Sequence, residues 1–381
     1  MRRSVVLLLL SGLALCLVIP ASAGARTFNV HAGQSIQRAV DRSHPGDTIF
    51  VRPGTYREHG VRCPTEPSVQ CAVAITKDGI SLIGRPRKNH PVVIENAGGQ
   101  DQGVSVGLTG DASCLTDQTE RVDGSLISGI VVNGFDGYGV HLFCVDNWRV
   151  TNTATNDNAE YGIFPSHVGA GRVDHSLATG SNDTGHYIGQ SHDVEIDHNV
   201  ASGNVSGYEI ENSTNVRAHD NEAFGNTGGI LTFTLPRLDV KVNTDNEIDH
   251  NNVHGNNKPN TCLDPSDDVC AVPQGTGILN VAADSNRIHD NLVTGNDTFG
   301  IAVASFCTND PSLCSGPLDI DTNPDNNQIR SNTVTGNGTN GDPNIPSFFD
   351  VDLAWDFTGV GNCWQDNTFG SSFPSPLPGC P

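Results

Sequence analysis

Apolar and polar positions along the chain recur in short blocks at a regular spacing. Seven segments share one pattern, in which an apolar residue is followed by two polar residues and then by Asn, Ser or Thr. Their fourth positions are Thr153, Ser176, Asn199, Asn221, Asn251, Asn291 and Asn332, which lie 23, 23, 22, 30, 40 and 41 residues apart. The basic period of 22 to 23 residues is too short for a helical repeat unit and fits three short strands joined by turns.

A second block in each period places a β-branched residue between outward-facing neighbours. Its members are Gly139-Val140, Gly162-Ile163, Tyr187-Ile188, Glu209-Ile210, Gly229-Ile230, Gly277-Ile278 and Gly300-Ile301. Strand alternation predicts that the Ile and Val side chains point inward. Asn recurs in the turns, where it tolerates the left-handed conformation and can bond to the Asn of the next coil. Stacked coils of this kind predict an all-β fold, the parallel β-helix.

The N-terminal region predicts a cap for this stack. Ile36, Ala39 and Val40 lie on one face of a helix within residues 33–40, and a solenoid needs its end covered. The helix runs into a strand between two turn signals, Pro45-Gly46-Asp47 and Pro53-Gly54. This opening resembles that of right-handed parallel β-helix proteins of the pectin-lyase-like superfamily, and the right-handedness follows from the resemblance.

A closer resemblance covers roughly residues 125–300. It rests on four segments, Tyr161 to Pro165, Tyr187 to Ser191, Glu209 to Ser213 and Gly228 to Pro236. These resemble a bacterial group of exported parallel β-helix repeat proteins without an established activity. The resemblance implies export and the fold, and it supplies no catalytic residues.

The expected domain organisation has four parts. Residues 1–23 read as a cleaved signal peptide, with Arg2 and Arg3 before an apolar run that ends at small residues. Residues 24–60 hold the N-terminal cap and first strands, residues 61–370 the β-helix, and residues 371–381 a Pro-rich tail. The expected location is secreted or extracytoplasmic, with no membrane association after cleavage.

Cysteines support this location. Ten remain after signal cleavage, an even number that is typical of a disulfide framework in an exported chain. We expect five pairs between sequence neighbours: Cys63 with Cys71, Cys114 with Cys144, Cys262 with Cys270, Cys307 with Cys314, and Cys363 with Cys380. Two of these pairs fall in the long 40- and 41-residue steps and predict disulfide-tied loops outside the coils.

Charge limits the partners. The 381 residues carry a formal charge of −22, with 21 Lys and Arg against 43 Asp and Glu. This balance argues against a nucleic-acid partner, because the chain would repel phosphates. It also means that a lyase-like reaction on a uronate polymer would require bound calcium, since residues 150–236 hold only Arg172 and Arg217 as basic side chains.

The candidate site is a group of outward side chains on the second strand. Glu209 and Glu211 flank Ile210, and Tyr187 is expected beside Glu209 one coil earlier. His141 is expected in the row of Glu211, and the small residues around this group predict a shallow concavity. Paired carboxyls can divide acid and base roles, with Tyr187 as a proton donor or acceptor. Catalysis, binding of sugar or cation, and a merely solvated face all remain open.

The recurring Asp-His pairs are a second constellation, for example Asp197-His198 and Asp249-His250. Adjacent residues of a strand point to opposite sides, so a charge ladder is a simpler interpretation than a metal site, and we expect no metal there.

Two function classes follow from the sequence as a whole. One is an exported protein that binds or processes an extracellular polysaccharide. The other is a non-catalytic surface protein or an accessory factor resembling the β-helix proteins of copper-enzyme maturation.

Overall fold

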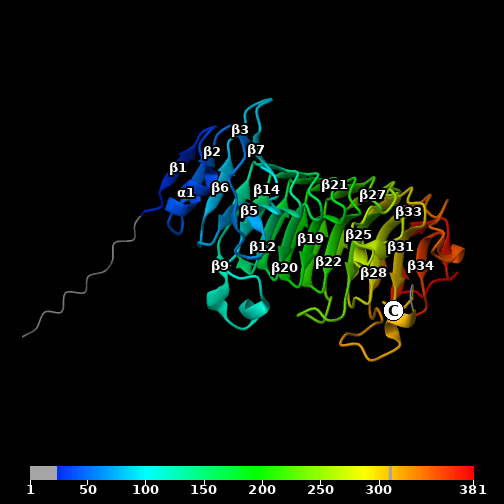
Figure 1. The fold of residues 1–381 in the computed structure, drawn as a ribbon. Coiled ribbons are helices and arrows are strands. Elements are labelled where there is room, and N and C mark those ends of the chain that lie inside the picture. The colour runs from blue at the N-terminus through cyan, green and yellow to red at the C-terminus, as the bar shows by residue number, and fades with distance from the viewer. Residues whose placement is uncertain (1–23, 309–310) are drawn as a thin grey trace, which may run out of the picture.

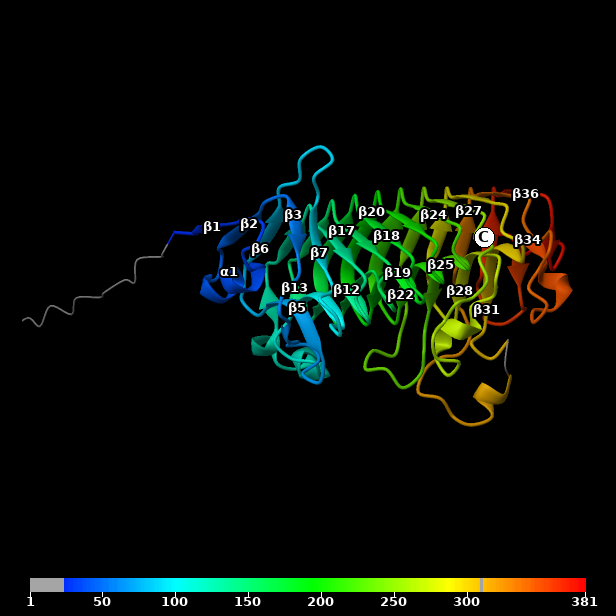
Figure 2. The same cartoon turned by 45° about the horizontal axis from the view of Figure 1, so that its top comes forward.

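The computed structural model describes residues 24–308 and 311–381, and the predicted signal peptide lies outside them. Within these residues the chain winds into a right-handed parallel β-helix with three long sheets, which confirms the predicted fold class (Figures 1 and 2). The described strands pair in parallel except for β4 with β5, which are antiparallel. Each coil therefore contributes one short strand to each sheet.

The strands of each sheet follow one another along the axis. Sheet A contains β1 (Thr27–Val30), β2 (Thr48–Val51), β6 (Ser81–Gly84), β10 (Leu126–Ser128), β14 (Arg149–Thr151), β17 (Gly169–Asp174), β20 (His192–Asp197), β23 (Thr214–His219), β26 (Glu247–Asp249), β29 (Arg287–His289), β32 (Gln328–Arg330) and β35 (Cys363–Gln365), with β9 (Val122–Asp123) and β13 (Val145–Asp146) beside them. Sheet B contains β3 (Gly54–Tyr56), β7 (Val92–Glu95), β11 (Val131–Asn133), β15 (Ala154–Asn156), β18 (Leu177–Thr179), β21 (Val200–Ser202), β24 (Glu222–Phe224), β27 (Asn252–His254), β30 (Leu292–Thr294), β33 (Thr333–Thr335) and β36 (Thr368–Phe369). Sheet C contains β4 (Val61–Arg62), β5 (Gln70–Ile75), β8 (Gln102–Val106), β12 (Tyr138–Phe143), β16 (Ile163–Ser166), β19 (Thr184–Gly189), β22 (Ser206–Glu211), β25 (Gly228–Phe233), β28 (Thr276–Val281), β31 (Phe299–Ala304), β34 (Val351–Trp355) and β37 (Ser372–Phe373).

Helix α1 (Ile36–Arg42) lies at the N-terminal end of the stack, as predicted. Ser35 caps it by accepting a hydrogen bond from the backbone N–H of Arg38. Ile36, Ala39 and Val40 are buried against the first coil. Short 3₁₀ helices occur farther along, at Ala112–Leu115, Gln118–Glu120, Asp268–Ala271, Pro311–Cys314 and Ser347–Phe349.

Buried asparagine ladders hold the corners of the coils, and they confirm the expected Asn stacking. One ladder runs from β20 onward, and each side-chain amide donates to the side-chain oxygen of the next Asn at 2.9–3.1 Å: Asn199, Asn221, Asn251, Asn291, Asn332 and Asn367. A second ladder has the same geometry: Asn204, Asn226, Asn256, Asn296 and Asn337. Because each Asn also accepts from a backbone N–H, the turns leave few buried polar groups unpaired.

Long insertions leave the stack at the two edges of sheet C. Residues 255–275 and 336–350 lie where sheet B leads into sheet C, and residues 107–125, 234–246 and 305–327 lie where sheet C leads into sheet A. Figures 1 and 2 show the loops of residues 107–125, 234–246 and 305–327 on the lower side of the molecule, and residues 336–350 at its C-terminal end. The corner between sheets A and B is short in most coils, so sheet C is the face that the loops surround.

The five disulfides join the predicted sequence neighbours. Cys262–Cys270 and Cys307–Cys314 close loops within the insertions. Cys363–Cys380 ties the C-terminal end to β35, where the backbone N–H of Trp364 donates to the carbonyl of Pro378 at 2.9 Å.

Candidate functional site

Strands β19 and β22 of sheet C bring the predicted site residues together. Tyr187 pairs with Glu209, and Gly189 pairs with Glu211, in the parallel register of these strands. Ile210 lies between the two glutamates and is fully buried in the core. The expected adjacency of Tyr187 with both glutamates on the outer face of sheet C is therefore present.

The structure corrects the position of His141. His141 pairs with Phe164, whose neighbour Ile163 pairs with His186, so His141 belongs to the row of Tyr187 and not to that of Glu211. The same register shows that Ile163 and Ile188 are not equivalent positions. The cause is His186, which points inward although its side chain is polar.

His186 occupies an inward position of β19 and stacks on Tyr208 of β22. The ring centroids are 5.1 Å apart and the planes differ by 13°. The Tyr208 hydroxyl donates to the Glu222 carbonyl at 3.2 Å, which satisfies it within the core. Both residues are buried, so an apolar pattern alone could not identify this inward row.

The predicted concavity is wrong in one respect, because its central side chains are covered. Tyr187 and Glu209 are each 4% exposed, and Glu211 is 9% exposed. Val272, from the insertion of residues 255–275, packs with Val205 and Leu231 on this face. Leu231 is the register partner of Glu209 on the following coil, so the insertion covers the strand face directly beside that glutamate.

A glycine lets Tyr187 reach the second glutamate. A Cβ atom at Gly189 would lie 1.9 Å from the Tyr187 hydroxyl oxygen, so the phenol ring lies across this position. The hydroxyl then interacts with Glu211, the register partner of Gly189. Tyr187 thereby connects β19 to the carboxyl pair on β22.

Burial moves the pKa values of the two carboxyls into the neutral range. It raises the pKa of Glu209 to about 7, and the charges of Glu211 and Asp268 act in the same direction. It raises the pKa of Glu211 to about 8, although the bond from Tyr187 opposes this. Burial and the two glutamates raise the pKa of Tyr187 well above its ordinary value, so the phenol remains a donor. Two carboxyls that exchange protons near pH 7 are suited to acid–base chemistry.

The pair is the inner end of a larger group that sequence reasoning missed, here called the acid–aromatic cluster. It adds five partly exposed side chains from the preceding coils: Tyr138, Glu160, Tyr161, Phe164 and Asp183. Burial and the Glu209 charge raise the pKa of Asp183 well above its ordinary value. Burial, with Asp267 and other acids, also raises the pKa of Glu160.

The aromatic rings of the cluster form a continuous shelf. Tyr161 stacks on Phe164 with ring centroids 4.2 Å apart and planes 15° apart. Tyr138 and Tyr187 lie 4.8 Å and 4.6 Å from Phe164. A signal for this shelf was available in the sequence, because Tyr138 and Tyr161 are 23 residues apart, one basic period, as are Glu160 and Asp183.

His141 lies beneath this shelf as a neutral imidazole. Burial lowers its pKa to about 3, and its ring stacks on Phe164 at 4.9 Å. Nδ1 lies 3.0 Å from the Thr65 hydroxyl and 3.1 Å from the Gln102 side-chain oxygen. Nε2 is enclosed and has no hydrogen-bond partner among the described residues. One buried polar atom of the site is thus left unpaired.

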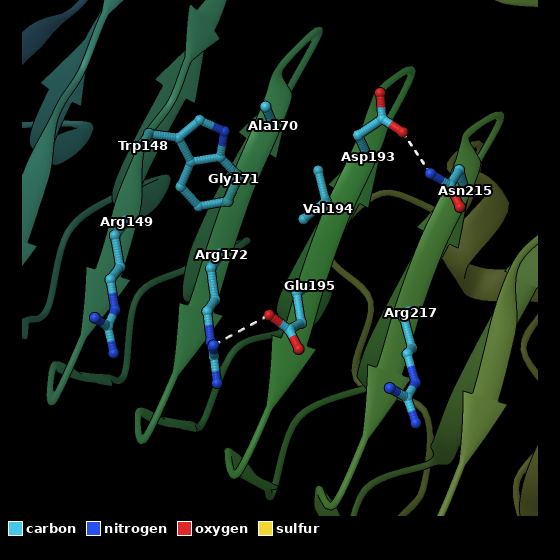
Figure 3. A pocket seen from close by; sticks show the side chains of 10 residues that line it. All are labelled: Trp148, Arg149, Ala170, Gly171, Arg172, Asp193, Val194, Glu195, Asn215 and Arg217. Carbon is cyan, nitrogen blue, oxygen red and sulfur yellow. Dashed lines mark hydrogen bonds and ion pairs between the residues drawn. The ribbon is translucent and has the colours of Figure 1, made fainter.

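The outer face of sheet A carries the Asp-His pairs as a charge ladder. Arg149 bonds Asp174 at 2.7 Å, and Arg172 bonds Asp197 at 2.6 Å and Glu195 at 3.1 Å. Figure 3 shows Arg149 and Arg172 on neighbouring strands, with Glu195 on the next strand between Arg172 and Arg217, in an open groove of about 420 Å³. The predicted ladder is therefore present.

The expected orientation of these Asp-His pairs is wrong. His175, His198 and His250 have positive φ angles of 49°, 54° and 55°, because each lies in the turn after its strand. Each imidazole therefore folds back, and its Nδ1 lies 2.7–2.8 Å from the preceding Asp carboxylate. In two clusters, each of two carboxylates and one imidazole, the possible ligand atoms lie within 4.8 Å of one another. These clusters are Glu195, Asp197 and His219, and Glu247, Asp249 and His289.

Comparison with known families identifies the lineage of the chain. Residues 120–368 match the family model described as "Periplasmic copper-binding protein (NosD)". The chain belongs to the NosD family. The matched residues of this NosD-family chain run from the last residue of the second 3₁₀ helix to the first residue of β36 and include the whole acid–aromatic cluster.

Solved structures agree on the fold of this NosD-family chain. The A-module of mannuronan C-5 epimerase AlgE4 from Azotobacter vinelandii is 15% identical with a TM-score of 0.55, covering 89% of this chain and 91% of that one. The periplasmic alginate epimerase AlgG is 14% identical with a TM-score of 0.52, covering 90% of this chain and 84% of that one. No curated protein matches the sequence. Among the described residues, no helix has the length and apolar character needed to cross a membrane.

Proposed function

We propose that this extracytoplasmic β-helix binds a polysaccharide across the outer face of sheet C and that Glu209 and Glu211 perform proton transfer on it. The observation that carries the proposal is the joining of two buried carboxyls, with pKa values near neutral, to a shelf of stacked aromatic rings. Aromatic walls with a few placed polar groups are typical of ligand sites. The similar solved structures bear the names of enzymes acting on mannuronan and alginate, which supports a polysaccharide as the class of ligand.

The proposal assigns a role to each group. Tyr138, Tyr161 and Phe164 offer faces for the apolar sides of sugar rings, because they are the partly exposed members of the cluster. The carboxyl that holds its proton at pH 7 acts as the acid, and its ionised partner acts as the base. Tyr187 is a positioning residue that holds Glu211 through its hydroxyl. The insertion of residues 255–275 limits access of water to the pair.

The charge of the site affects the choice of sugar. Glu160, Asp183, Glu209 and Glu211 lie together, and the causes that set the pKa values of the two glutamates include no cation. An uncharged glycan meets no repulsion there. A uronate polymer would need calcium between its carboxylates and those of the site, so we expect EDTA to abolish its binding to the acid–aromatic cluster and to leave the binding of neutral glycans unaffected.

A second candidate function is an accessory role in copper-enzyme maturation, which the family description favours. The side chains that could bind copper test this candidate. Every cysteine of the described residues is in a disulfide, and the single methionine, Met1, lies outside them. Arg172 already binds Glu195 and Asp197, and Arg287 binds Glu247 at 3.0 Å. Guanidinium groups on the candidate ligands oppose a copper ion. The described residues therefore do not fit a copper site.

Glycan binding and turnover by the purified chain test the proposal. The probes are dextran, polygalacturonate and alginate, with and without calcium. We expect Tyr161→Ala to weaken binding at least about fivefold, because it removes the shelf. Glu209→Gln and Glu211→Gln should leave glycan binding unchanged and should lower turnover on the order of 10²-fold or more.

Two control variants match these changes on another sheet. Phe224→Ala removes an exposed ring of sheet B that stacks on His254 at 5.4 Å, and Glu222→Gln neutralises an exposed carboxyl there. Both controls should behave as the wild type. The proposal fails if no probe binds, or if Tyr161→Ala and Phe224→Ala are indistinguishable from each other.

A further inference from the structure

The charge of the chain is divided between its ends. Residues 24–90 contain ten Lys and Arg against five Asp and Glu, whereas residues 91–381 contain nine against 38. The basic part comprises α1 and the first coils, at the N-terminal end of the stack (Figure 1). A strongly acidic protein thus has one basic end.

A groove lies within this basic end. It has a volume of about 560 Å³ and is lined by His31, Arg52, Pro53, Arg87 and His90, here called the N-terminal groove. His31 and Arg52 follow directly after β1 and β2, and Arg87 and His90 belong to the hairpin between β6 and β7. This hairpin stands out from the stack near β3 and β7 in both views (Figures 1 and 2).

The cations of the groove have no acidic partner. Among the described residues, Arg52, Arg85, Arg87 and Lys88 form no ion pair, in contrast to the arginines on the acidic part of sheet A. The Arg52 Nη2 donates to the Asn29 side-chain oxygen at 2.8 Å, while its Nε is enclosed and unpartnered. Arg85 lies 3.9 Å above the Phe50 ring, which holds the base of the hairpin.

The nearby carboxylates are engaged elsewhere. Glu58 accepts from the Ser35 hydroxyl and the Ile36 backbone N–H, at 2.6 Å and 2.7 Å. Glu95 pairs with Arg57 at 2.5 Å. Because these acids do not neutralise the groove, its positive charge is available to an external anion.

We propose that the N-terminal groove binds the carboxylate or sulfate groups of an acidic polysaccharide. Guanidinium groups match the geometry of such oxyanions, and two arginines with two imidazoles line a space large enough for an oligosaccharide segment. The 38 acids of residues 91–381 repel the rest of a polyanion, so contact is confined to this end. The site is separate from the acid–aromatic cluster.

The structure favours this ligand over a membrane or a nucleic acid. None of the exposed large apolar side chains of the described chain lies in residues 24–90, so this end offers nothing to insert into a bilayer. A nucleic acid stacks its bases on exposed aromatic rings or presents a long run of phosphates, and the groove lining contains neither Phe, Tyr nor Trp.

Binding of polygalacturonate in the presence of EDTA tests the proposal, because EDTA removes any calcium-dependent contribution. The test variant is Arg52→Gln with Arg87→Gln. The control is Lys241→Gln with Arg287→Gln, which removes the same charge from side chains paired with Asp319 at 2.6 Å and Glu247 at 3.0 Å. We expect the wild-type affinity to fall on the order of tenfold between roughly 50 and 200 mM salt, and the test variant to lose about tenfold at low salt. The control should lose less than about twofold.

The other probes decide the class of ligand. Dextran should not bind to this end, and Tyr161→Ala should leave EDTA-resistant binding of polygalacturonate unchanged. Equal loss in the test and control variants would overturn the proposal. So would a loss of dextran binding in the test variant as large as its loss of polygalacturonate binding. Binding of anionic lipid vesicles or of single-stranded DNA, without binding of polygalacturonate, would overturn it as well.

Discussion

Replacing Glu211 by Gln is expected to make the folded chain more stable at pH 7. It is also expected to remove the part of the pH dependence of folding stability that comes from the Glu211 carboxyl. Burial raises the pKa of Glu211 from 4.5 to about 8. The folded state therefore holds this proton more tightly than the unfolded chain does. Its contribution to stability is complete below about pH 4.5 and is lost progressively as the pH rises towards 8, by about 1.4 kcal/mol per pH unit within that window.

Between about pH 5 and pH 7 this amounts to roughly 2 to 3 kcal/mol, which corresponds to about 3 °C in the melting temperature of a chain of this size. Glutamine carries no charge at either pH and can still accept from the Tyr187 hydroxyl. The wild type and Glu211→Gln should therefore melt together near pH 5 and separate by several degrees at pH 7, with the variant higher. Glu209 retains its own, similar dependence in this variant.

Thermal unfolding followed by circular dichroism from pH 5 to pH 8 measures this difference. Glu222→Gln is the matched control, because its carboxyl is 43% exposed on sheet B and bonds His254 at 3.2 Å. The control should follow the wild-type curve at every pH. Parallel curves for the wild type and Glu211→Gln would refute the reasoning, since they would mean that Glu211 exchanges its proton equally in the folded and unfolded states.

Three further changes test the surrounding structure. Ile210→Asp should lower the free energy of unfolding by at least about 3 kcal/mol in urea titrations, because a charge enters the core; an unchanged midpoint would contradict the inward position. Gly189→Ala should displace the Tyr187 ring and abolish turnover. Loss of the bond from Tyr187 should also raise the pKa of Glu211 further, as measured by carboxyl NMR; wild-type turnover would refute the contact between Tyr187 and Glu211. Replacing Cys262 and Cys270 by Ser should keep the far-UV β signal while hydrogen exchange in β22 increases, and loss of the β signal would show that the loop is needed for the fold.

The fold was predictable because each repeated structural position of the coils requires one particular residue type, which then recurs at a regular spacing in the sequence. An Asn at a corner must satisfy backbone groups of its own coil and the next, so Asn251 and Asn291 repeat visibly in the sequence. The disulfide pairs were predictable for a similar reason, since Cys262 and Cys270 close a loop of few residues. Both signals are local, and neither requires knowledge of how distant loops fold over the sheets.

The site was predictable only in part. Tyr187 and Glu209 share a register position one period apart, which the repeat reveals. The cover over them comes from Val272, far along the chain, in an insertion with no periodic signal. The inward rows were harder still, because His186 and Tyr208 fill the core with aromatic rings where an apolar pattern expects Ile or Val. Packing across coils decided these positions.

The asparagine ladders have a consequence for how such proteins diversify. Within residues 255–275 the added segment starts directly after the ladder residue Asn256. Within residues 234–246 and 305–327 it ends directly before Asn246 and Asn327, whose side chains accept from the backbone of the preceding coils. A segment added at such a junction leaves both flanking bonds intact, so natural selection can lengthen or exchange it without a penalty to the stack. Inherited variation is thereby directed to the walls of sheet C, where new ligand preferences can arise on an unchanged scaffold.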